Sequence, residues 1–317
     1  MIAASNGRPS RKRPKGYAPW NPREETRRVL RQVGRVLEEY RDYLPMTNRQ
    51  IFYRLVGAFG YPKTERGYAN LCEYLSRARR AGAIPFEHIR DDGISVIAAN
   101  HYADEDHFYQ RVRRLGESYT VDKLARQSVS VRVYCEAAGL LPQIARVGGR
   151  YSVPVYSCSG FDSLTAKHEL ARECAENFTY EGKSTAVIHL GDFDPSGVSI
   201  FESMSEDVRA FVSGDISHKD PGEVALFERA ALTSEQVEAY SLETAPPKKT
   251  DSRSAKWKGE TCQLEALTPD QLARIVEESI TRFVDLDLYR LDCEEEVTAR
   301  RNIVRALPSG ASPGGGT

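Results

Sequence analysis

Two aspartates separated by one residue follow a largely apolar run in the second half of the chain. Residues 187–190 (VIHL) end at Gly191, and Asp192 and Asp194 then lead into a Pro-Ser-Gly stretch at 195–197. This order is typical of a buried parallel strand that delivers acidic side chains to the carboxyl edge of a sheet, where a helix then begins. Carboxylate oxygens gathered at such an edge suit a hard divalent cation such as Mg²⁺.

A third acid, Glu136, follows an earlier apolar run at residues 131–135. Because side chains alternate along an extended chain, Asp192 and Asp194 share a face. Three converging carboxylates repel one another, and Mg²⁺ offsets that repulsion while keeping waters that a phosphate can displace. We therefore predict a Mg²⁺ site formed by Glu136, Asp192 and Asp194.

Two side chains near these acids also have plain structural interpretations. Glu136 could instead form an ion pair with Arg132 or Arg146. His189 lies inside the strand that leads to the aspartates, and we interpret it as a packed residue rather than a ligand.

Alternating strand and helix patterns surround the acids. Strands are predicted over 131–136, 153–157, 184–191 and 223–231, and the helices between them over 137–147, 161–177 and 196–212. This alternation predicts an α/β fold with a parallel, Rossmann-like sheet that binds ligands at the carboxyl ends of its strands.

The N-terminal half instead begins with three helical patterns, over about 22–44, from Thr47 to about 59, and 66–81. Thr47 and Gln50 match a capping box. A short strand and turn at 84–93 would complete a winged helix-turn-helix domain, and its third helix would place Arg77, Arg79 and Arg80 on DNA phosphates. A small helical bundle with a solvated charged face is the alternative.

Charge is distributed unevenly along the chain. Residues 1–128 carry a net charge of +9 and the remainder −10, which suggests a polyanion-binding module beside a cation-binding one. The 40 % hydrophobic and 28 % charged residues indicate a globular protein. No run is apolar enough for a membrane span, and the basic start of the chain is not a secretory signal. The six cysteines are scattered along the chain, which fits a reducing cytoplasm. A DNA-binding protein in that compartment would be nucleoid-associated.

The acid motifs resemble a known module. Glu136 with Gly139, together with residues 192–197 (DFDPSG), resemble the two halves of a Toprim domain. Residues 47–53 (TNRQIFY) resemble the Thr-x-Arg-x-(Ile/Leu)-Tyr-Tyr stretch of the topoisomerase VI A subunit and the related meiotic double-strand-break protein, with Phe52 as a departure. A winged-helix domain precedes Toprim in that superfamily. The resemblance covers roughly residues 22–290, and the chain looks most like the compact, single-chain relatives of the A subunit.

The resemblance implies that Tyr53 cleaves DNA and forms a 5′-phosphotyrosyl link. It also implies a homodimer in which the tyrosine of one subunit meets the acids of the other. The tyrosine hydroxyl has an ordinary pKa near 10, and Arg49, one helical turn earlier, could lower it and hold the phosphate. Glu136 could bind metal or handle the proton of the 3′ hydroxyl.

These expectations define the domains and a function. We expect a disordered basic arm at 1–21, a winged-helix DNA-binding domain at 22–103, a helical linker at 104–128, a Toprim domain with C-terminal helices at 129–307, and a flexible tail at 308–317. A basic loop at 246–259 would contact DNA through Lys256 and Lys258, unless it is an ordinary exposed linker.

The expected activity is Mg²⁺-dependent cleavage of double-stranded DNA by a type IIB topoisomerase A-like enzyme. No GxxxxGK[ST] stretch occurs, so strand passage would need an ATPase partner. The alternatives are a Toprim nuclease in which water attacks the phosphate, and a non-catalytic DNA-binding protein.

Overall fold

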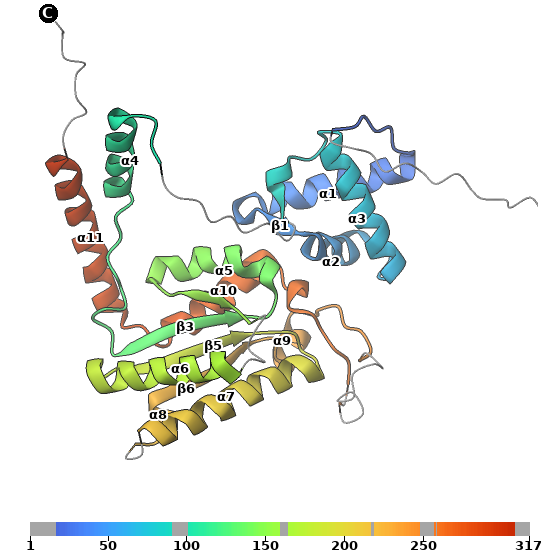
Figure 1. Ribbon diagram of the computed structural model, residues 1–317. Coiled ribbons are helices and arrows are strands. Elements are labelled where there is room, and N and C mark those ends of the chain that lie inside the picture. The colour runs from blue at the N-terminus through green and yellow to red at the C-terminus, as the bar shows by residue number, and fades with distance from the viewer. Residues whose placement is uncertain are drawn as a thin grey trace, which may run out of the picture. The chain divides into compact units, whose positions relative to one another are not determined.

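The chain folds into two compact units, residues 1–91 (unit 1) and residues 92–317 (unit 2). The computed structural model describes residues 17–90, 101–158, 164–216, 219–247, 257 and 259–307 (Figure 1). The predicted tail at 308–317 and most of the predicted arm at 1–21 lie outside these residues.

Unit 1 is mainly helical. Its elements are α1 (Glu24–Glu39), β1 (Met46–Thr47), α2 (Asn48–Phe59), α3 (Glu65–Arg80) and β2 (Ile89–Arg90). The predicted capping box is confirmed, because the Thr47 hydroxyl accepts from the Gln50 amide at 3.1 Å and the Gln50 side chain accepts from the Thr47 amide at 2.9 Å. Both bonds satisfy donors that the first turn of α2 leaves without helical partners.

Only the first part of the predicted strand and turn at 84–93 lies within the described residues. A short strand was expected at 84–86, but the strand in this region is β2, and it pairs in parallel with β1, Met46 opposite Ile89. Burial explains the pairing, since Met46 is fully buried and Ile89 is 3 % exposed. Residues 91–93 of the predicted turn lie outside the described residues, and the winged-helix assignment stays a prediction.

Unit 2 is an α/β structure, as predicted. Its four-stranded sheet has the order β4-β3-β5-β6, and every neighbouring pair of strands is parallel. The strands are β3 (Val129–Cys135), β4 (Val155–Ser157), β5 (Ser184–Leu190) and β6 (Ala225–Ala231). The helices are α4 (Glu105–Glu117), α5 (Leu141–Gly148), α6 (Leu164–Glu176), α7 (Pro195–Asp215), α8 (Pro221–Val224), α9 (Ser234–Ala239), α10 (Pro269–Thr281) and α11 (Leu286–Ala306).

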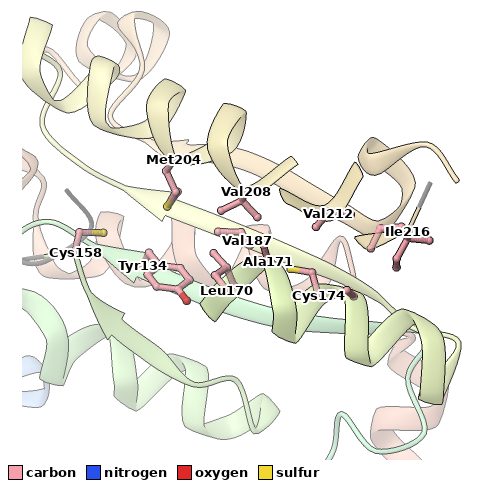
Figure 2. Close-up of a cluster of buried hydrophobic side chains, with 13 residues drawn as sticks. Tyr134, Cys158, Leu170, Ala171, Cys174, Val187, Met204, Val208, Val212 and Ile216 are labelled. Carbon is pink, nitrogen blue, oxygen red and sulfur yellow. The ribbon is translucent and has the colours of Figure 1, made fainter. Parts of the chain in front are cut away.

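Helices cover both faces of this sheet, with α6 and α7 on one side and α5 and α10 on the other (Figure 1). Figure 2 shows the core between the sheet and the first pair, where Tyr134 and Val187 meet Leu170 of α6 and Met204 of α7. The alternate strand residues, such as Ile188, are fully buried toward the opposite face. Burial on both faces explains why the strands read as nearly continuous apolar runs.

Helix α11 is joined to the segment between α4 and β3 by two ion pairs that each include a buried side chain. Lys123 Nζ lies 2.5 Å from Glu296 Oε2, and Arg126 pairs with Asp292, whose side chain is 3 % exposed. Helix α4, in the segment predicted as a linker, packs on α11 in unit 2, and Gly116 permits close contact with Ile303. Within the described residues, we find no helix with the length and apolar character needed to cross a membrane.

Candidate functional site

The three predicted acids meet at one edge of the unit 2 sheet. Cys135 and Leu190 are register partners at the ends of β3 and β5, and the Glu136 amide continues the ladder by donating to the Leu190 carbonyl at 2.9 Å. Glu136 therefore leaves the sheet directly beside the turn that carries Asp192 and Asp194.

Two glycines allow the Glu136 side chain to lie across this turn. A Cβ built on Gly191 would clash with Glu136 Oε1 and lie 2.7 Å from the His189 ring. A Cβ on Gly197 would clash with the Asp192 carbonyl oxygen and lie 3.2 Å from Glu136 Oε2. The site thus requires glycine at both positions because backbone and carboxylate approach closely there.

Each aspartate is oriented by a backbone amide. Asp194 is the N-cap of α7, and its Oδ1 accepts from the Gly197 amide at 2.7 Å. Asp192 Oδ1 accepts from the Leu264 amide at 2.8 Å. The segment containing Leu264 is held in place by a bridge between Phe193 and Cys262. These bonds help to fix the directions of both carboxylates.

A buried arginine that the sequence did not single out lies beneath the turn. Arg229 of β6 donates to the carbonyl oxygens of Asp192 at 2.6 Å and Gly197 at 2.9 Å, and its Nε donates to the Leu232 carbonyl at 3.3 Å. The guanidinium therefore supports the backbone on both sides of Asp194. The sequence signal was a charged pair, Glu228 and Arg229, within a largely apolar strand, but nothing in the sequence placed that strand next to β5.

His189 is also part of the site. Its side chain is fully buried, and its Nε2 lies 3.2 Å from Glu136 Oε1. Its Nδ1 lies 3.4 Å from Arg229 Nη1, because His189 and Arg229 are register partners on neighbouring strands. The interpretation of His189 as a packed residue holds, as its ring also lies 5.3 Å from that of Phe201, but its two nitrogens face charged groups.

Burial controls the charges at this site. It lowers the pKa of the Arg229 guanidinium, and the carboxylates of Glu136, Asp194 and Asp192 act in the opposite direction. Burial likewise lowers the pKa of His189, while the nearby Glu136 carboxylate raises it. The alternative ion pair of Glu136 with Arg132 is not formed, since Arg132 pairs with Glu173 at 2.5 Å.

The acids at this edge supply donors of the kind that Mg²⁺ prefers. The donors are carboxylate oxygens, and Glu136 Oε1 is buried without a hydrogen-bond partner in the described part of the chain. Among the described residues, no group of three or more His, Cys, Asp or Glu side chains is arranged to hold a metal ion. Mg²⁺ is usually held by one or two carboxylates plus waters and substrate phosphates, so a Mg²⁺ site at this edge stays a prediction.

Unit 1 contains the predicted nucleophile. Tyr53 lies in α2 and is 8 % exposed. The Arg49 guanidinium lies 5.4 Å from the centre of the Tyr68 ring, whereas Lys63 Nζ lies 5.9 Å from the centre of the Tyr53 ring. Lys63 is thus a cation near Tyr53 that the sequence reasoning missed, because it follows α2 rather than belonging to it.

The predicted DNA-contacting arginines of α3 are partly used within unit 1. Arg77 pairs with Glu73 at 2.7 Å and lies over the ring of Trp20, and Arg79 lies 4.7 Å from the centre of the Phe86 ring. Arg77, Arg79 and Arg80 are all half-buried rather than largely outward-facing. Lys256 and Lys258 of the predicted basic loop lie outside the described residues.

Comparisons with known proteins add no family to this picture. No protein-family model matches the chain, and neither the curated proteins nor the solved structures contain a match.

Proposed function

We propose that this protein is a Mg²⁺-dependent DNA-cleaving enzyme of the topoisomerase VI A type, with Tyr53 as its nucleophile. The observation that supports this function best is the convergence of Glu136, Asp192 and Asp194 at the carboxyl ends of two adjacent parallel strands. The resemblance of residues 47–53 to the tyrosine motif of that superfamily adds the nucleophile.

The proposed reaction is a reversible transesterification. The Tyr53 hydroxyl loses its proton, and its oxygen forms a bond to phosphorus while the bond between phosphorus and the 3′ oxygen breaks. The 3′ oxygen takes up a proton, and the 5′ phosphate stays bonded to the tyrosine. Glu136, whose side chain is 18 % exposed, would accept or return a proton near the sheet edge.

The acids would hold the metal ion. Asp192 and Asp194, with Glu136 beside them, would supply its protein ligands, and the bound ion would stabilise negative charge on the phosphate. Arg229 lies below the same turn and adds a fixed positive charge to the site.

The proposal extends to the partners. The positive charge of residues 1–128, including Arg77, Arg79 and Arg80, would serve binding to double-stranded DNA. By resemblance, two copies of the chain would act together, and an ATPase subunit would be needed for strand passage.

The burial of Tyr53 favours a second candidate function. A side chain that is 8 % exposed must become more accessible before it can attack a phosphate. A Toprim nuclease, in which water attacks and the same acids hold Mg²⁺, does not require that change.

Plasmid cleavage by the full chain tests the proposal. With supercoiled DNA and Mg²⁺ or Mn²⁺, we expect breaks from the natural protein, no breaks from Asp192→Asn, and no breaks from Tyr53→Phe. Tyr180→Phe, at an 82 % exposed position of unit 2, is the matched control and should cleave normally. Cleavage by Tyr53→Phe would establish the nuclease, and salt-sensitive DNA binding without any cleavage would establish a non-catalytic DNA-binding protein.

A further inference from the structure

Three polar side chains form a continuous chain beneath the acid edge of unit 2. Arg229 Nη1 lies 3.4 Å from His189 Nδ1, and His189 Nε2 lies 3.2 Å from Glu136 Oε1. The His189 side chain is fully buried, and that of Glu136 is 18 % exposed. The order of contacts is therefore guanidinium, imidazole, carboxylate.

The guanidinium determines the tautomer of His189. An arginine side chain has donors only, so a nitrogen that faces it must accept and cannot itself carry a proton. Nδ1 of His189 is thus the unprotonated nitrogen, and a neutral imidazole then carries its proton on Nε2. That proton faces Glu136.

Two buried polar atoms at this contact lack a hydrogen bond of good geometry. Glu136 Oε1 and His189 Nε2 are both buried, and neither has an aligned hydrogen-bond partner among the described residues. Leaving a buried donor or acceptor unsatisfied is costly, and a bond from Nε2–H to Oε1 satisfies both atoms. The 3.2 Å separation requires only a change in angle.

We propose that His189 is a positioning residue that holds Glu136 through an Nε2–H bond, and that Arg229 selects the tautomer that makes this bond. Arg229 is itself immobilised by the Asp192 and Gly197 carbonyls. The Arg229 guanidinium thus holds the backbone of the aspartate turn directly and orients the Glu136 carboxylate through His189. The role of this arrangement in metal-dependent DNA cleavage rests on the proposed function. The assignment of the His189 proton to Nε2 does not depend on that function.

The tautomer can be measured directly. In the metal-free full chain, long-range ¹H–¹⁵N spectra of the imidazole rings distinguish Nε2–H from Nδ1–H histidine, and loss of one signal in His189→Gln assigns it among the six histidines. We expect His189 to be neutral with its proton on Nε2. A proton on Nδ1, or on both nitrogens, at neutral pH would overturn the proposal whatever the protein does to DNA.

Two substitutions test the link to Glu136. The amide nitrogen of His189→Gln reaches the position of Nε2, whereas that of His189→Asn reaches only the position of Nδ1. We expect His189→Asn to lower Mn²⁺ affinity by about 10- to 100-fold, the usual effect of losing a group that orients a metal ligand. His189→Gln should retain most of the affinity, and the exposed His168→Asn is the control.

The outcomes separate the two proposals. Equal losses in His189→Asn and His189→Gln, or no loss in either, would contradict the positioning role. If the natural protein binds no Mn²⁺, the proposed metal-dependent function is wrong, and the histidine spectrum still decides the tautomer. If Tyr53→Phe cleaves DNA, only the tyrosine nucleophile is excluded.

Discussion

The backbone amide of Glu136 donates to the carbonyl oxygen of Leu190 across 2.9 Å. This bond extends the β3–β5 ladder one residue past the end of β3. It therefore places an acid from one half of the α/β unit against the turn that carries Asp192 and Asp194. The parallel direction of the two strands is what brings both carboxyl ends to one edge.

Asp194→Asn should separate metal binding from folding. Asparagine caps a helix as well as aspartate does, so α7 should keep its N-terminal bond to Gly197 and the free energy of unfolding should change little. Loss of the negative charge should lower Mn²⁺ affinity by at least about tenfold, measured by calorimetry. Asp287→Asn, whose side chain is 88 % exposed, is the control. Unchanged affinity in Asp194→Asn would remove this residue from the site.

Gly191→Ala should disturb the site sterically. The new methyl group would overlap Glu136 Oε1, and the forced shift should cost about 1–3 kcal/mol of unfolding free energy and weaken Mn²⁺ binding. Gly214→Ala, near the end of α7, meets no atom within 4 Å and should stabilise the protein by up to about 1 kcal/mol. Equal stability of the two variants in urea titrations would contradict the steric role of Gly191.

The capping box should stabilise the helix that carries Tyr53. Thr47→Ala removes the bond to the Gln50 amide and should lower the opening free energy of α2 by about 1 kcal/mol, whereas Thr47→Ser should keep most of it. Hydrogen exchange of the α2 amides in the full chain measures this effect. Identical exchange in the alanine and serine variants would contradict the role of the hydroxyl.

The Lys123–Glu296 pair predicts a pH dependence of stability. Burial raises the pKa of the Glu296 carboxyl, but hydrogen bonds from Lys123 and the Val121 amide outweigh this and hold the pKa below its ordinary value of 4.5. A carboxyl whose folded-state pKa is lowered contributes stability above its unfolded pKa and loses it as pH falls through the folded one. The contribution should be complete at pH 7 and should disappear below pH 4.5.

The Glu296→Gln variant tests the predicted direction of this pH dependence. At pH 7 it should destabilise the protein by about 3–5 kcal/mol, because the ammonium group of Lys123, which is 5 % exposed, would lose its carboxylate partner. The difference from the natural protein, followed by urea unfolding, should shrink as pH falls below 4.5. A difference that grows toward low pH would contradict the assignment.

Local patterns in the sequence predicted local structure well. The Thr47–Gln50 pair fixed the start of α2, and the apolar runs before Glu136 and Asp192 became β3 and β5 within a parallel sheet. These features succeed because the responsible atoms are near neighbours in the chain or follow a strict period.

The role of Arg229 could not be read in the same way. It depends on β6 lying next to β5 in the register that pairs Arg229 with His189; the register then shifts, so that Leu190 aligns with Ala231 rather than Ala230. Such an irregularity redirects side chains near the strand end and leaves no short sequence signature. The burial of Tyr53 likewise depends on how α2 packs, which its helical period does not specify.

The most direct test of the central claim is the covalent adduct. The full chain is incubated with Mg²⁺ and duplex DNA labelled at a 3′ end, and the reaction is stopped with detergent. We predict that labelled fragments remain attached to protein through their 5′ phosphates, and that the adduct is absent in Tyr53→Phe and retained in Tyr180→Phe. Cleavage by Tyr53→Phe that leaves free 5′ ends, or an adduct that persists in this variant, would contradict the assignment of Tyr53 as the nucleophile.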